Sequence, residues 1–154
     1  MDSELSYRTP GERANGGTAS RGGFDDPLLD LRVGDLMTPG CVVISEAATV
    51  AEAARTLSTH RVHAVLVVGA RNGTPLGWIT HRGLLGWIGR DRSDARASEA
   101  ITEQVRAIPA HASIHTARYA LSQSGATRLL VRSRRDQLPE GVLSDFDLAV
   151  AIGR

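Results

Sequence analysis

The pattern of apolar and polar positions between residues 42 and 60 predicts a short strand followed by a helix. Val42–Ile44 is an apolar run typical of a strand. The helix is expected to begin after Thr49, whose hydroxyl can accept from the free amides of the first turn, and to end near His60. Its apolar stripe recurs at i, i+3, i+4 and i+7 and consists of Val50, Ala53, Ala54 and Leu57.

Two more strands and a second helix complete the predicted unit. The continuous aliphatic run 64–68 is typical of a buried strand. A tight turn at Asn72-Gly73 leads into a partner strand over residues 76–80. A second helix is predicted over residues 81–89, with one apolar side formed by Leu84, Leu85 and Ile88. The order is therefore strand, helix, strand, strand, helix.

The same order occurs a second time, 64 residues further along the chain. Gly77–Thr80 aligns with Gly141–Ser144 at this offset, and Ile88–Arg90 aligns with Ile152–Arg154. One offset holds without a gap from about residue 33 to residue 90, which indicates an internal duplication. In the second copy the predicted helix cap is Ser113, and the apolar stripe consists of Ile114, Ala117 and Leu121.

The repeat divides the chain into four predicted parts. They are a tail over residues 1–26, a first unit over 27–90, a charged linker over 91–96 and a second unit over 97–154. The tail is rich in Gly, Ser and Arg and has almost no aliphatic side chains, so it cannot bury enough surface to offset its chain entropy. We therefore expect the tail to be disordered.

Composition excludes several classes of function. The chain has 154 residues with a net charge of +1, which gives no general attraction to nucleic acid or membranes. No apolar run approaches the roughly 20 residues that span a bilayer, and the N-terminus lacks a secretory signal, so a cytoplasmic location is expected. The single cysteine, Cys41, excludes an internal disulfide. All 18 basic residues are arginine, which excludes lysine-based catalysis.

Three segments of the repeat resemble those of one protein family. Val33–Thr38 is similar to its lead-in, Thr49–Ala53 to its first helix, and Gly141–Leu148 to its closing signature, Gly–apolar–apolar–Thr/Ser–x–x–Asp. A duplicated unit of about 60 residues with these segments resembles the CBS domain pair, or Bateman module, over about 120 residues. The resemblance implies an α+β fold in which two β-α-β-β-α units pack about a pseudo-twofold axis. It also implies two clefts that often bind adenosine-containing ligands, and association into a homodimer.

The closing signature supplies the first candidate ligand-binding residues, Ser144, Asp145 and Asp147. Free amides at the start of a helix favour an anion such as phosphate, and a carboxylate one turn further can accept from both hydroxyls of a ribose. By resemblance, Asp147 binds the ribose and Ser144 contacts a phosphate or the ribose. The alternative interpretation is that Ser144 or Asp145 only caps the helix.

The first copy departs from this signature. Thr80 keeps the hydroxyl and is retained as a candidate, but Gly83 stands where the second copy has its aspartate. A charged hydrogen bond contributes roughly 1.5–3 kcal/mol, so its loss corresponds to binding weaker by about tenfold to a hundredfold. One competent nucleoside site is therefore expected, in the second unit.

Contacts to the base and the phosphate follow only from the resemblance. The base is expected against the opening strand of the second unit, at Arg106, Ala107 and Ile108, with Arg106 either a ligand contact or a solvated edge residue. Family members often carry a His-Arg pair before the central strand, and here it is split between the copies. Arg128 is the expected phosphate clamp, and His63 is expected to add a hydrogen bond.

Metal binding and catalysis have little support in the sequence. The pairs His60/His63 and His111/His115 lack third and fourth ligands at suitable spacing, so no metal site is predicted. No nucleophile elbow or glycine-rich phosphate loop occurs, so the chain is not expected to be an enzyme. Trp87 is interpreted as an anchor of the dimer contact, with a core position as the alternative.

Two hypotheses for the function result. The first is a stand-alone regulatory module that senses an adenosine-containing ligand mainly through its second unit. AMP is the first choice, followed by ADP or ATP, NAD and S-adenosylmethionine, and no cofactor is required. The second is a ligand-free homodimeric scaffold that recruits another, unidentified protein.

Overall fold

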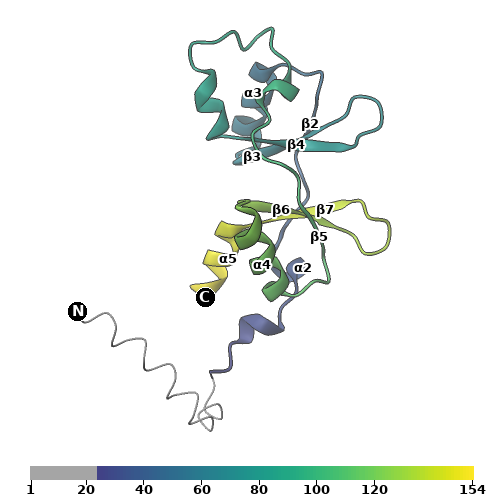
Figure 1. Ribbon diagram of the computed structural model, residues 1–154, viewed down its shortest axis with the longest axis vertical. Coiled ribbons are helices and arrows are strands. Elements are labelled where there is room, and N and C mark those ends of the chain that lie inside the picture. Colours follow the sequence, from purple (N-terminus) through teal and green to yellow (C-terminus); the bar gives the residue numbers. More distant parts are fainter. Residues whose placement is uncertain (1–23) are drawn as a thin grey trace, which may run out of the picture.

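The structure, a computed structural model, describes residues 24–154 and has two β-sheets facing each other at its centre (Figure 1). One sheet has the order β2-β3-β4, with β2 (Val43–Ser45), β3 (Ala64–Val68) and β4 (Pro75–Thr80). The other has the order β1-β7-β6-β5, with β1 (Thr38–Pro39), β5 (Ala107–Pro109), β6 (Arg128–Arg132) and β7 (Pro139–Ser144). Helices cover the outer face of each sheet, which confirms the expected α+β fold (Figure 1).

The caps of the two long helices agree with the sequence prediction. In α3 (Val50–His60), Thr49 Oγ1 accepts from Glu52 N, and Glu52 Oε1 accepts from Thr49 N. In α4 (Ile114–Ser124), Ser113 Oγ accepts from Thr116 N. These contacts satisfy amides that otherwise have no partner in the first turn of a helix. The other helical elements are η2 (Pro27–Asp30), α2 (Val33–Leu36), η3 (Gly83–Trp87), η4 (Ala97–Ala100) and α5 (Asp145–Ile152).

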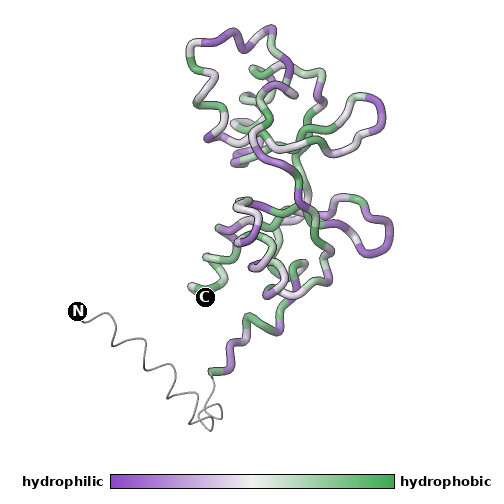
Figure 2. Tube along the Cα trace, in the orientation of Figure 1, coloured by the Kyte–Doolittle hydropathy of each residue, from purple (hydrophilic) through white to green (hydrophobic). Residues whose placement is uncertain are grey.

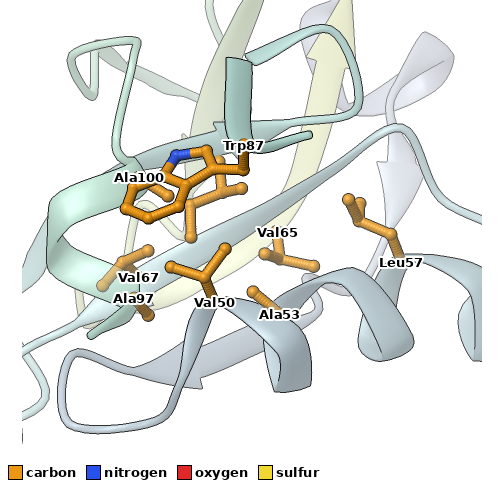
Figure 3. Close-up of a cluster of buried hydrophobic side chains, with 9 residues drawn as sticks. Val50, Ala53, Leu57, Val65, Val67, Trp87, Ala97 and Ala100 are labelled. Carbon is orange, nitrogen blue, oxygen red and sulfur yellow. The ribbon is translucent and has the colours of Figure 1, made fainter. Parts of the chain in front are cut away.

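The helix expected over residues 81–89 is shorter than predicted and forms only the 3₁₀ turn η3. Gly83 and Gly86 lie within its five residues, and each glycine costs roughly 1 kcal/mol relative to alanine in a helix. Trp87 in this turn is only 6% exposed and packs in the core between α3 and its sheet (Figure 3). Its interpretation as a dimer anchor is therefore wrong, and the core alternative holds.

Side chains alternate between two cores along the central strands. Val65 and Val67 of β3 face the outer core beneath α3, whereas Leu66 faces the opposite sheet. In β6, Leu129 and Val131 likewise face the outer core beneath α4. A central core joins the two sheets and consists of Leu66, Trp78 and Leu130. The strands around it include some of the most hydrophobic parts of the chain trace (Figure 2).

The segment that precedes the first repeat packs on the second unit. Strand β1 pairs with β7 in antiparallel orientation, with Thr38 opposite Val142 and Pro39 opposite Gly141. Val33 of α2 is fully buried in the second unit's outer core. Residues 33–40 of the first lead-in segment (residues 33–42) therefore belong by packing to the second unit, whereas Val42 at its end packs on the first unit.

The segment that precedes the second repeat packs in turn on the first unit. Ala97 and Ala100 of η4 are buried in the core beneath α3. Thr102 N donates to Trp78 O at 3.1 Å, and Trp78 N donates to Glu103 O at 2.9 Å. Each unit thus packs against the lead-in segment of the other. The boundaries of the two units by packing therefore differ from the boundaries at residues 90 and 97 that the repeat indicates. The predicted disordered tail lies outside the described residues, except for residues 24–26.

A test of this exchange is the substitution Gly141→Ala. A Cβ at this position would lie 2.6 Å from both the Thr38 carbonyl oxygen and Met37 Sδ, so β1 would have to move away from β7. Overpacking of this kind costs about 1–3 kcal/mol, and we expect a loss of that size in the free energy of unfolding measured in urea. Gly86→Ala is the matched control, because a Cβ there meets no atom within 4 Å. Equal stability of the two variants would contradict the close packing of β1 on β7.

Candidate cavity between the two units

A cavity of about 800 Å³ lies between the units, within the size range of small-molecule sites. The first lead-in segment forms one wall with residues 38–42. The first unit contributes residues 61–64 and 80–82, and the second contributes the corner 144–147. The remaining lining residues are Trp78, Glu103, Thr127, Arg128 and Val142.

Strand β7 meets helix α5 at the corner formed by Ser144 and Asp147. Ser144 Oγ accepts from Asp147 N at 3.1 Å, and Asp147 Oδ2 accepts from Ser144 N at 2.8 Å. Ser144 thus caps the helix, and the same pair of bonds fixes the carboxylate of Asp147. Asp147 is half-buried on the cavity wall, and its Oδ1 has no hydrogen-bond partner among residues 24–154. Asp145 lines the same corner with an exposed side chain.

The corresponding corner of the first copy has no carboxylate and is closely packed around Gly83. Thr80 is 8% exposed, and its Oγ1 accepts from Gly83 N at 3.0 Å. A Cβ on Gly83, the position equivalent to Asp147, would lie 2.7 Å from Thr102 Oγ1. A side chain at position 83 therefore has no room, and the two corners are not equivalent.

Arg128 lies beside the Ser144 corner but is already paired with another residue. Its Cα is opposite that of Ser144 in the β6–β7 register. Its Nε donates to Glu103 Oε1 at 3.1 Å, and its Nη2 donates to Thr127 Oγ1 at 2.8 Å. The guanidinium carbon lies 5.9 Å from the centre of the Trp78 ring, within the range of a cation–π contact. No motif in the sequence indicates Glu103 as a site residue.

Four further basic side chains line the cavity from the first unit. His63 is exposed, and its ring centre lies 5.0 Å from that of His81. His81 Nδ1 lies 3.2 Å from the His63 carbonyl oxygen. Arg61 and Arg82 are also in the lining. His81 and Arg82 were not predicted from the sequence, although the offset of 64 aligns them with Asp145 and Phe146 of the closing signature.

The expected base contacts, Arg106, Ala107 and Ile108, do not line this cavity. Arg106 and Ala107 are exposed elsewhere, and Ile108 is buried in the second unit's outer core. The reason is the strand order, because β5 lies at the opposite edge of the sheet from β1 and is separated from β7 by β6. The first lead-in segment lines the same cavity as Asp147, and its Cys41 and Val42 correspond by the repeat to Val105 and Arg106.

Other chemistry has little support in the described residues. Burial raises the pKa of the Cys41 thiol to about 11, so the thiol stays protonated and poorly nucleophilic at neutral pH. Within residues 24–154, no three His, Cys, Asp or Glu side chains are grouped to hold a metal ion. None of the helices in this range is long and apolar enough to cross a bilayer.

Comparison with known proteins identifies the fold. Residues 33–90 match the CBS domain family, whereas no curated protein sequence matches the chain. The CBS domain of a bacterial CNNM/CorC family Mg²⁺ transporter, solved with ATP, has a TM-score of 0.71 and 20% identity, covering 82% of this chain and 89% of its own. An AMP-bound CBS domain protein from Pyrobaculum aerophilum has a TM-score of 0.66 and 20% identity, covering 80% of this chain and 97% of its own.

A third structure, CBSX2 in complex with AMP, has a TM-score of 0.63 and 21% identity, covering 80% of this chain and 99% of its own. At these identities the likeness shows the fold, and the fold covers both units. CBS domains are generally regulatory rather than catalytic. The chain thus matches the CBS domain family over residues 33–90, and the internal repeat and the shared fold extend this likeness to the second unit.

Proposed function

We propose that this protein binds an adenine nucleotide in the cavity between its units and acts as a regulatory sensor of that nucleotide. The observation that carries the proposal is Asp147, whose carboxylate is fixed on the cavity wall by its bond to Ser144 N while Oδ1 has no partner among the described residues. Support comes from the CBS-domain structures of similar fold that contain AMP or ATP. AMP is the first choice of ligand.

The lining suggests how such a ligand is held. The ribose hydroxyls donate to Asp147 Oδ1, because a carboxylate can accept from two hydroxyls at once. The base lies against the wall that includes Cys41 and Val42. The phosphate faces the basic side of the cavity, where His63 and Arg128 are the expected contacts.

Isothermal titration calorimetry on protein freed of co-purified nucleotide tests this function. We expect AMP, ADP or ATP to bind with one site per chain, because the first copy has Gly83 and no carboxylate at the position of Asp147. GMP serves as the control for recognition of the base. Absence of binding by adenosine and all three adenine nucleotides would contradict the proposal and favour the ligand-free scaffold.

The alternative scaffold function is favoured by exposed apolar side chains on two helical elements. Phe146 and Ile152 of α5 are 71% and 73% exposed, and Leu85 and Ile88 at η3 are 60% and 75% exposed. Clusters of exposed apolar side chains are typical of protein interfaces. We therefore propose that the protein forms a homodimer, alone or together with a protein target. Light scattering tests this by comparing the molar mass in solution of Phe146→Ser with that of the native chain. An unchanged mass would show that Phe146 is not part of the interface.

A further inference from the structure

The ion pair between Glu103 and Arg128 joins the two units at the wall of the cavity. The main chain of Glu103 is bound to the first unit, since its carbonyl oxygen accepts from Trp78 N at 2.9 Å. Its carboxylate reaches the second unit, where Arg128 Nε donates to Oε1 at 3.1 Å and Thr127 Oγ1 donates to Oε2 at 2.9 Å. Both Glu103 and Arg128 are in the lining of the cavity.

Arg128 is the cation best placed to meet a phosphate at the Ser144–Asp147 corner. Its neighbour Leu129 faces the outer core, as does Leu143 next to Ser144. Because side chains alternate along a strand, Arg128 and Ser144 both project from the face directed at the other unit. Their Cα atoms are opposite each other in the β6–β7 register. A phosphate at this corner therefore lies within the field of Arg128.

Glu103 neutralises that field. The side chains of Arg128 and Glu103 are only 13% and 19% exposed, so water screens their charges much less than at an open surface. A phosphate that approaches Arg128 must compete with the carboxylate for the guanidinium and is repelled by it. A closed set of bonds among Glu103, Thr127 and Arg128 holds the carboxylate in place.

The pair is present on one side of the pseudo-twofold arrangement only. By the offset of 64, Glu103 corresponds to Pro39 and Arg128 to Ala64. Neither counterpart carries a charge. The feature is thus a property of this chain and not a consequence of the repeated fold.

We infer that Glu103 sets the charge selectivity of the cavity by holding Arg128, so that each added phosphate contributes less affinity than the basic lining otherwise allows. This inference rests on the proposed nucleotide function and concerns the same site. Under it, Glu103 is a specificity-determining residue. The cavity favours ligands with few phosphates. Arg128 can bind a phosphate only when its ion pair with the Glu103 carboxylate is broken.

The test is the variant Glu103→Gln, titrated by calorimetry with adenosine, AMP and ATP. Glutamine keeps the length of the side chain and its hydrogen bonding to Thr127 but carries no charge. We expect the variant to bind ATP about tenfold more tightly than the native chain does, because charge-assisted hydrogen bonds are roughly twice as strong as neutral ones. The affinity for adenosine is expected to stay unchanged, and the gain in affinity for AMP is expected to be smaller than the gain for ATP. Glu140→Gln is the matched control, since it makes the same change in net charge outside the cavity lining.

A second variant gives an independent measurement. Arg128→Gln leaves the carboxylate of Glu103 without its cation, so ATP affinity is expected to fall while adenosine binding stays within about twofold. In the double variant, Arg128→Gln is expected to cancel the gain in ATP affinity that Glu103→Gln gives alone. A double-mutant cycle measures this coupling between the two residues.

The possible results separate this inference from the proposed function. If the native chain binds neither adenosine nor any adenine nucleotide, the proposed function fails. If the native chain binds nucleotides and Glu103→Gln changes adenosine and ATP affinity by the same factor, or weakens ATP alone, the selectivity role of Glu103 is overturned. Parallel changes for both ligands in Arg128→Gln would overturn it as well, even if Glu103→Gln did not fold.

Discussion

Replacing Asp147 with alanine is expected to weaken the binding of adenosine and its nucleotides by on the order of a hundredfold, close to the loss of measurable binding. The variant lacks the carboxylate that is expected to accept from both ribose hydroxyls, and each hydrogen bond to a charged group contributes roughly 1.5–3 kcal/mol. Calorimetry with adenosine is the most direct measurement, because adenosine has no phosphate and reports on the ribose corner alone. Asp147→Asn keeps an acceptor for Ser144 N and is expected to lose less affinity.

The control for Asp147→Ala must account for its second role as a helix cap. Glu52 makes the same contact at the start of α3, where Oε1 accepts from Thr49 N at 2.8 Å, and it lies outside the cavity lining. Glu52→Ala and Asp147→Ala are each expected to lower the free energy of unfolding by about 0.5–2 kcal/mol. Only Asp147→Ala is expected to impair binding. Native affinity for adenosine in that variant would contradict the ribose contact.

The substitution Trp78→Ala is expected to lower the free energy of unfolding by about 3–5 kcal/mol, the largest loss of stability among the proposed variants. Trp78 is 1% exposed and packs with Leu66 and Leu130, which come from opposite sheets. Removing it leaves a void at the junction of the units that neither sheet can fill alone. Urea denaturation measures the loss, provided that the slope with denaturant concentration stays constant.

Trp87→Ala is the matched control for the central core, because it removes the same side chain from the outer core of the first unit. Both variants are expected to lose stability, but only Trp78→Ala alters the lining of the cavity and is expected to weaken nucleotide binding. The indole Nε1 of Trp78 is buried without a hydrogen-bond partner among the described residues, so Trp78→Phe is expected to cost less than alanine. A loss below about 1 kcal/mol in Trp78→Ala would contradict the central packing.

Local features of the fold were predictable because their causes lie within a few residues of each other. Helix α3 begins at Val50, directly after its cap Thr49, and ends at His60, as the apolar stripe and the cap predict. Where local signals conflict, the prediction was less accurate. Residues 81–89 have an apolar stripe, but Gly83 and Gly86 reduce the expected helix to the short turn η3.

Contacts between distant segments were not predictable from periodicity. The pairing of Thr38 with Val142 spans more than one hundred residues of sequence, and neither strand has a pattern that indicates its partner. The base contacts at Arg106–Ile108 were expected from the family resemblance, and no periodicity indicates that the first lead-in segment lines the same cavity as Asp147. Glu103 has no signature that sequence periodicity detects, because its role depends on reaching Arg128 across the two units.

The exchange of lead-in segments makes each half of the duplicated chain an essential part of the other. A fragment that ended at Arg90 would lack Ala97 and Ala100, which fill the core beneath α3. A fragment that began at Ala97 would lack Val33 and the edge strand that covers β7. Each repeat therefore needs the other's lead-in segment to complete its core, and a substitution in either segment is expected to destabilise the repeat on which it packs.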